Sequence, residues 1–60
     1  MTHFKIKKSE NFENLWEIFY RGLFRYRPSN YGVFDSQEEA ANMLLNEYKG
    51  EGIIIHYENI

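Results

Sequence analysis

The residues best equipped for chemistry in this chain are cationic side chains, and the chemistry open to them is the binding of an anionic surface. Arg21, Arg25 and Arg27 recur at short intervals among aromatic residues, and lysines alternate with apolar residues near the beginning. Guanidinium groups form forked hydrogen bonds with carboxylates and with phosphates, so acidic proteins and nucleic acids are both suitable ligands. Aromatic side chains beside such cations serve as anchors. The expected binding residues are Lys5, Lys7, Phe19, Arg21, Arg25, Arg27 and Tyr31.

The charges divide along the chain. Residues 1–31 carry six lysine or arginine residues and three glutamates, a net charge of +3. Residues 32–60 carry one lysine and six acidic residues, a net charge of −5, so the total of −2 hides two oppositely charged halves. This division indicates a binding surface, although it does not name the ligand.

The same residues argue against an enzyme. Cysteine is absent and His3 and His56 are the only histidines, whereas a nucleophile needs a nearby base and an orienting partner. Both histidines could lie on the outer sheet face, where with Glu58 they could bind a metal weakly, but two solvent-exposed histidines are the simpler interpretation. Gly50 and Gly52 follow a helical segment rather than opening one, so they form no phosphate loop. We expect no catalytic residue, no metal and no cofactor.

Length and composition predict a single domain over residues 1–60, close to the lower size limit for unaided folding. Five Phe, five Tyr and one Trp are too many to fit under one helix. Some rings must therefore be exposed or covered by a second subunit, which is compatible with a homodimer. No apolar run approaches the ~20 residues needed to span a bilayer. The first residues do not resemble a secretion signal, so we expect a cytoplasmic protein without a membrane partner.

Alternating apolar and polar residues predict three strands in the first half. The first covers residues 3–7, and aromatic residues on both sides of Gly22 predict a hairpin over 16–27. After a bend at 28–30, residues 31–34 resume an extended path. In this hairpin the inward residues are Trp16, Ile18, Tyr20, Phe24 and Tyr26. The outward residues are Glu17, Phe19, Arg21, Arg25 and Arg27.

Residues 36–48 predict a helix, and residues 53–57 predict a final strand. Ser36 and Glu39 form a capping box, and Gly50 and Gly52 are suited to a left-handed helix end. The predicted fold is α+β: a small, mostly antiparallel sheet of three to four strands with one helix on one face, in the order β-β-β-α-β. The expected core is Phe4, Ile6, Trp16, Ile18, Tyr20, Phe24, Tyr26, Val33, Ala41, Leu44, Leu45, Tyr48, Ile53 and Ile55.

An alternative interpretation makes residues 9–22 a helix. Ser9 would cap it, Phe12, Leu15, Trp16 and Phe19 would form its apolar face, and Gly22 would end it. Arg21 would then lie in the last helical turn, and its part of the basic sheet face would be lost.

One pattern resembles a known architecture. The residues Trp16-x-Ile18-x-Tyr20-Arg21-Gly22, followed by Phe34-x-Ser36-x-x-Glu39-Ala40, are similar in build to the N-terminal domains of phage-type tyrosine integrases. The similarity covers about residues 16–45. Those domains lay a three-stranded sheet in the DNA major groove, so the resemblance implies that Arg21, Arg25 and Arg27 face the groove.

Two functional hypotheses follow. The first is a small non-enzymatic protein-binding module, a regulator or inhibitor of the compact kind that viruses and mobile elements often encode. Its basic, aromatic sheet face would dock on an acidic partner and occlude it. The alternative is a nucleic-acid-binding domain that uses the same face, with Phe19 or Tyr31 stacking on a base.

Overall fold

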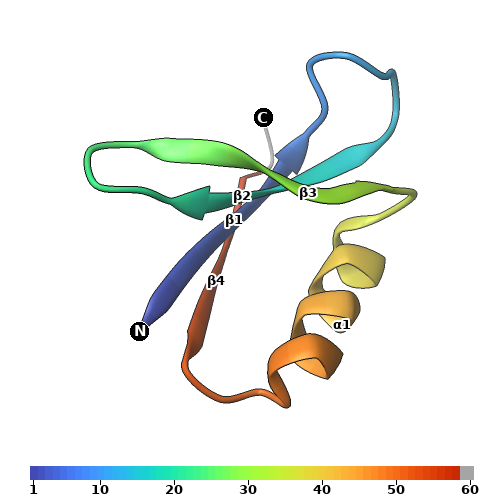
Figure 1. The fold of residues 1–60 in the computed structure, drawn as a ribbon. Helices are drawn as coiled ribbons and strands as arrows, with labels where there is room; N and C mark the ends of the chain where they lie inside the picture. The colour runs from blue at the N-terminus through green and yellow to red at the C-terminus, as the bar shows by residue number, and fades with distance from the viewer. Residues whose placement is uncertain (59–60) are drawn as a thin grey trace.

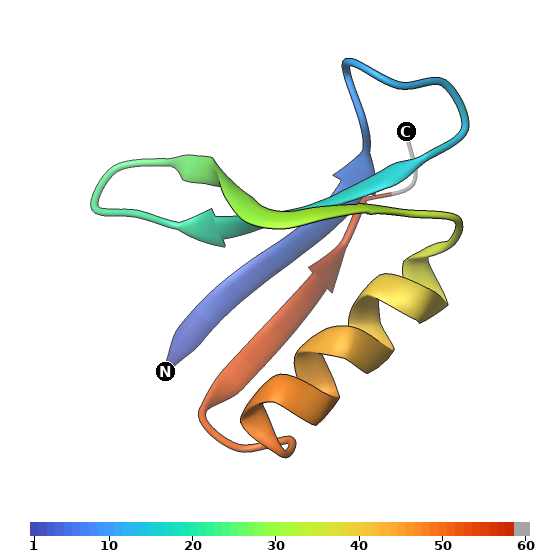
Figure 2. The same cartoon turned by 45° about the vertical axis from the view of Figure 1, so that its right-hand side comes forward.

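A computed structural model describes residues 1–58 as one sheet with a single helix against one face (Figure 1). The elements are β1 (Thr2–Lys8), β2 (Trp16–Arg21), β3 (Tyr26–Phe34), α1 (Gln37–Tyr48) and β4 (Ile53–Tyr57). The four strands lie in the order β3-β2-β1-β4. β1 pairs with β2, and β2 with β3, in antiparallel fashion, whereas β1 and β4 are parallel. Figure 2 shows β1 and β4 side by side. The predicted α+β fold and its element order are confirmed.

The helix begins where the capping residues predict. Ser36 has extended backbone angles (φ −150°, ψ 162°), and its Oγ accepts a hydrogen bond of 3.1 Å from the Glu39 amide. This bond satisfies one of the amides that a helix leaves unpaired at its start. At the other end the left-handed conformation begins at Lys49 (φ 55°), and the expected glycines Gly50 and Gly52 also have positive φ (72° and 74°). The Gly50 amide then donates to the Leu45 carbonyl at 3.0 Å, which closes the last turn.

The core lies between the helix and the two central strands. It is formed by a cluster of six buried residues: Phe4, Ile6, Ile18, Ala40, Ala41 and Leu44. The two alanines let the helix approach β1 and β2 closely, and Leu44 fills the space between them. The partly buried residues around this cluster include Trp16, Tyr48, Ile53 and Ile55, all of which were expected in the core.

Five residues expected in the core are not buried in it. Tyr20, Val33 and Leu45 are 39%, 42% and 43% exposed, and Phe24 is 92% exposed. Tyr26 is half-buried, but its pairing partner Arg21 places it on the face away from the helix. Conversely, Phe19 was assigned to the outer face and is nevertheless only 8% exposed.

The hairpin explains the positions of Phe24 and Tyr26. The connection runs from Gly22 to Arg25 and is closed by a 2.8 Å hydrogen bond from the Gly22 amide to the Arg25 carbonyl. β3 therefore begins at Tyr26, and Arg27 pairs with Tyr20. A shift of one residue moves every side chain of a strand to the opposite face. The expected assignment of residues 24–27 was wrong for this reason.

The alternative helix over residues 9–22 is also wrong, because residues 16–21 form β2. Ser9 caps the loop between β1 and β2 instead of a helix. Its Oγ accepts hydrogen bonds from the amides of Asn11 and Phe12, both at 3.1 Å, and it donates to Glu17 at 2.5 Å. The Ser9 amide also donates to the Leu15 carbonyl at 2.8 Å, which closes the loop.

β3 is interrupted near its middle. Its pairing with β2 jumps from Phe19–Pro28 to Glu17–Val33, so extra residues of β3 bulge out between these pairs. Ser29 fastens the bulge by donating a 2.6 Å hydrogen bond to the Ile18 carbonyl. The bulge turns Tyr31 towards the helix and leaves Val33 on the outer face.

Across residues 1–58, no helix has both the length and the apolar character that crossing a bilayer requires.

Candidate functional site

The sheet face opposite α1 has no helix over it, and we call it the uncovered face. Residues paired across neighbouring strands point to the same side of a sheet. The register therefore places Lys5 with Phe19, and Arg21 with Tyr26, on the side away from the buried cluster. The full set on this face is His3, Lys5, Lys7, Glu17, Phe19, Arg21, Tyr26, Pro28, Val33, Ile54 and His56.

Lysines cover the aromatic rings of this face. The Lys5 Nζ lies 4.3 Å from the centre of the Tyr26 ring, and the Lys7 Nζ lies 4.5 Å from that of Phe19. Such cation–π contacts contribute about 0.5–1 kcal/mol at exposed sites. They also explain the burial of Phe19, whose ring lies beneath a lysine chain. Phe19 therefore supports the surface and is not available as the anchor that the sequence suggested.

Four of the expected binding residues meet at the outer edge of β3. A hollow of about 490 Å³ is lined by Lys7, Glu10, Phe19, Tyr20, Arg25, Tyr26, Arg27 and Pro28. Arg25 comes to it from the hairpin loop, and Arg27 from the edge strand. The arginines therefore do not form one row on the sheet, but two of them still converge with Lys7.

Most of these cations have no anionic partner within the described chain. The single ion pair among residues 1–58 joins the Lys7 Nζ to Glu10 at 3.7 Å. Lys5, Arg21 and Arg25 are thus left without a carboxylate partner in this part of the chain. A surface of this kind can accept carboxylates or phosphates from a ligand.

The hairpin loop carries the most exposed apolar residues near these cations. Leu23 and Phe24 are 88% and 92% exposed. They line a second hollow of about 470 Å³ together with Arg21, Gly22, Arg25 and Tyr26. Figure 1 shows that this hairpin reaches away from α1. Leu23 and Phe24 were not among the expected binding residues, because the sequence pattern places them within a strand and no local signal reveals the longer turn.

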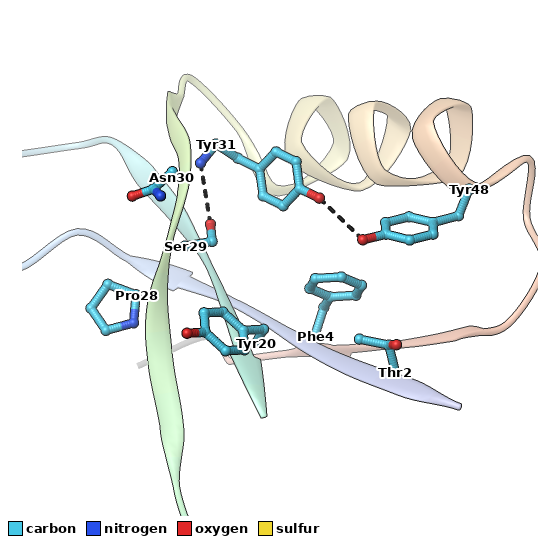
Figure 3. Close-up of a pocket in the computed structure, with 8 residues that line it drawn as sticks. All are labelled: Thr2, Phe4, Tyr20, Pro28, Ser29, Asn30, Tyr31 and Tyr48. Carbon is cyan, nitrogen blue, oxygen red and sulfur yellow. Dashed lines mark hydrogen bonds between the residues drawn. The ribbon is translucent and has the colours of Figure 1, made fainter. Parts of the chain in front are cut away.

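Tyr31, the remaining expected binding residue, lies on the helix side. Its hydroxyl is 3.2 Å from that of Tyr48, and its ring meets Phe4 edge-on at 6.4 Å (Figure 3). The hydrogen bond between Tyr31 and Tyr48, together with partial burial, raises the pKa of Tyr31 to about 12. These rings border a pocket of about 370 Å³, which is lined by Thr2, Phe4, Tyr20, Pro28, Ser29, Asn30, Tyr31 and Tyr48. Tyr31 therefore cannot act together with the cations of the uncovered face.

His3 and His56 do meet on the uncovered face, on neighbouring parallel strands. The Nδ1 of His3 lies 3.0 Å from the Nε2 of His56, and the ring centres are 5.2 Å apart in planes that differ by 9°. The distance between the ring centres is close to the sum of the nitrogen–nitrogen distance and the two centre-to-nitrogen distances within the rings. The two nitrogens therefore point directly at each other. Desolvation, followed by the charges of Arg21 and His56, lowers the pKa of His3.

This histidine pair is not completed into a metal centre within the described chain. Nowhere in residues 1–58 do three side chains of His, Cys, Asp or Glu come close enough to hold a metal ion, so Glu58 does not join the pair. The facing nitrogens are already used by their own hydrogen bond. The pair therefore links β1 to β4, and its neighbour Arg21 makes the site unfavourable for a cation.

Comparisons with family models, with curated proteins and with solved structures find no match to this chain.

Proposed function

We propose that the chain is a small non-enzymatic protein-binding module that docks on an acidic partner surface. The observation that carries this proposal is the projecting hairpin, where Leu23 and Phe24 stand fully exposed between unpaired arginines. Aromatic residues and arginine are enriched at protein interfaces, and arginine is also among the residues that dominate their binding energy. Leu23 and Phe24 would supply the buried contact, and the arginines would set its orientation.

The distribution of charge supports an acidic partner. The acidic residues Glu38, Glu39 and Glu47 lie on α1, on one side of the sheet, whereas Lys5 and Arg21 lie on the other. An approaching acidic surface therefore meets the cations of the uncovered face without first meeting these carboxylates. Opposed potentials of this kind raise the rate of association and select the orientation of docking. Occlusion of the partner's surface is the resulting mode of action, as expected for a regulator or inhibitor.

The experiment reverses the charge of the hairpin. Immobilised wild-type chain and the variant Arg25→Glu/Arg27→Glu are compared for capture of proteins from nuclease-treated lysate, with capture quantified by mass spectrometry. Proteins specific to the wild type should be lost from the variant, because each reversal replaces attraction by repulsion. Lys8→Glu is the matched control, since Lys8 is an exposed cation that pairs with Trp16, at the opposite end of β2 from the hairpin. Equal capture by wild type and double variant would eliminate the proposal.

Nucleic-acid binding through the same surface is the second candidate. It is favoured by the convergence of Lys7, Arg25 and Arg27 on one hollow. The hairpin loop that carries Arg25 also presents the exposed phenyl ring of Phe24. Affinity should then fall steeply with salt, with a log–log slope of about −3 to −5 if that many phosphates are contacted. A gel-shift titration at low salt that shows no retardation would remove this candidate, and capture that survives nuclease treatment favours the first.

A further inference from the structure

The outer edge of β4 is an unusually open sheet edge. β4 is the last strand in the order β3-β2-β1-β4, and no segment of residues 1–58 pairs with its outer side. Its sequence, Ile-Ile-Ile-His-Tyr, contains no charged residue and no proline. Two of its apolar side chains are also exposed: Ile54 at 37% and Tyr57 at 52%. A strand edge of this composition is a template for pairing with another strand.

The opposite edge of the sheet is protected. β3 contains Pro28, which has no amide hydrogen to donate to a neighbouring strand. It also carries Arg27 and is bent by the bulge between its two pairing regions. These are the features by which natural proteins prevent edge pairing. The two edges of one sheet therefore differ: one is blocked and the other is open.

We propose that β4 pairs with β4 of a second copy of this chain. A two-fold axis beside the strand brings the two identical edges together in antiparallel fashion, so that each copy satisfies the unpaired backbone groups of the other. The combined sheet runs β3-β2-β1-β4 and then the same strands of the partner in reverse. Both of its outer edges are then the protected β3 edges, so assembly stops at the dimer.

The surfaces of the two copies are compatible with this contact. The β4 segment brings no charge to the shared edge, so no like charges oppose each other there. Ile54, which lies on the uncovered face, would be covered by the partner strand. The arginine-bearing hairpins remain free at the two far ends, and the pairing therefore stands independent of the proposed protein partner.

A charge placed beside the open edge tests the pairing. Ile54→Lys places a lysine at a position that is already exposed, so that the two copies would bring two lysines to the shared edge. The matched control is Val33→Lys. Ile54 and Val33 are both β-branched, both on the uncovered face and both on edge strands, with exposures of 37% and 42%. In sedimentation experiments over a range of concentrations, the wild type and Val33→Lys should dimerise, and Ile54→Lys should dimerise about tenfold or more weakly.

Hydrogen exchange of the wild type gives a second measurement that needs no variant. Amides of residues 53–57 should exchange more slowly at high protein concentration than at low concentration, and those of residues 26–34 should not change. A wild type that stays monomeric at all concentrations would overturn the pairing. So would a dimer that Val33→Lys weakens as much as Ile54→Lys, or one that protects β3 instead of β4.

Discussion

The hydroxyl oxygens of Tyr31 and Tyr48 lie 3.2 Å apart and join the bulged part of β3 to the last turn of α1. Both rings pack on Phe4, with centres 6.4 and 5.5 Å from its own. The contact therefore connects the helix to the edge strand β3. It also closes one wall of the pocket on the helix side of the sheet (Figure 3).

Tyr48→Phe removes this hydrogen bond and leaves the ring in place. The pKa of Tyr31, which the bond helps to raise to about 12, should fall. Because the raised pKa belongs to the folded state, the associated stability is present below pH ~10 and is lost as the pH rises towards the folded value. Ultraviolet titration of tyrosinate should show ionisation at lower pH in the variant. Tyr57→Phe is the control, and an identical shift there would contradict the assignment.

Leu44→Ala tests the packing of helix on sheet. Leu44 is completely buried in the core cluster, so its truncation should cost about 2–5 kcal/mol. At this chain length such a loss is large enough to unfold the protein. Leu45→Ala is the matched control, because the neighbouring leucine is 43% exposed and should cost under ~1 kcal/mol. Chemical denaturation measures both, and equal losses would refute the packing.

The histidine pair should make the stability of the sheet depend on pH. Since the pKa of His3 is lowered in the folded chain, the unfolded chain binds more protons just below pH ~6.5. Stability should be fully present above that pH and should decline as the pH falls through the window. The charges of Arg21, His56 and the N-terminal amine all lower the pKa of His3. Lys5, which pairs with His56 on the neighbouring strand, is a further cation beside the pair.

Urea unfolding at several pH values between 7 and 5 measures this dependence. His56→Gln removes one member of the pair, so the slope of unfolding free energy against pH should become shallower. Carboxylates contribute equally to both proteins and cancel in the comparison. An unchanged slope in the variant would show that the pair does not couple protonation to folding.

Ser36→Ala should destabilise the helix start by about 1 kcal/mol, because the Glu39 amide loses the acceptor that now lies at 3.1 Å. Thermal unfolding monitored by circular dichroism measures the change. Ser36→Asp, which keeps an acceptor at the same position, should restore most of the loss. A failure of Asp to restore it would indicate that the serine acts through some other contact.

Replacing both hairpin residues in the variant Leu23→Ser/Phe24→Ser should leave stability within about 0.5 kcal/mol, because neither side chain is buried. The same change should abolish partner capture if these residues anchor the complex. Phe12→Ser is the matched control, since Phe12 is 55% exposed and lies in a different loop. Loss of capture by the control as well would point to a general apolar effect.

The fold was predictable where local rules are strong, and the surface was less so. The serine cap and the apolar positions of residues 40–44 define the helix, and alternation defines β1 around Phe4 and Ile6. β2 was also recognised, because Trp16 and Ile18 alternate with polar residues. Each of these signals lies within one element and needs no knowledge of its neighbours.

The arrangement of the arginines depends on register, which is not a local property. A connection of three residues after Gly22 and one of four residues are equally plausible from the sequence. The choice decides which of Tyr26 and Arg27 faces the helix and which faces solvent. The bulge around Ser29 adds a second change of face before Tyr31. The neighbouring positions of His3 and His56 could be anticipated, because alternation places both on the outer side of strands expected in the same sheet.

The parallel pairing of β1 with β4 has a consequence for how the molecule reaches its native state. Thr2 pairs with Ile53, and Ile6 with Tyr57. The central strand β1 therefore cannot complete its pairing until β4, almost the whole chain length later, has been synthesised. Contacts so distant in sequence close slowly and late. A nascent chain would leave Phe4 and Ile6 without their full cover until that segment emerged, which makes the interval before its arrival the time of greatest risk of aggregation.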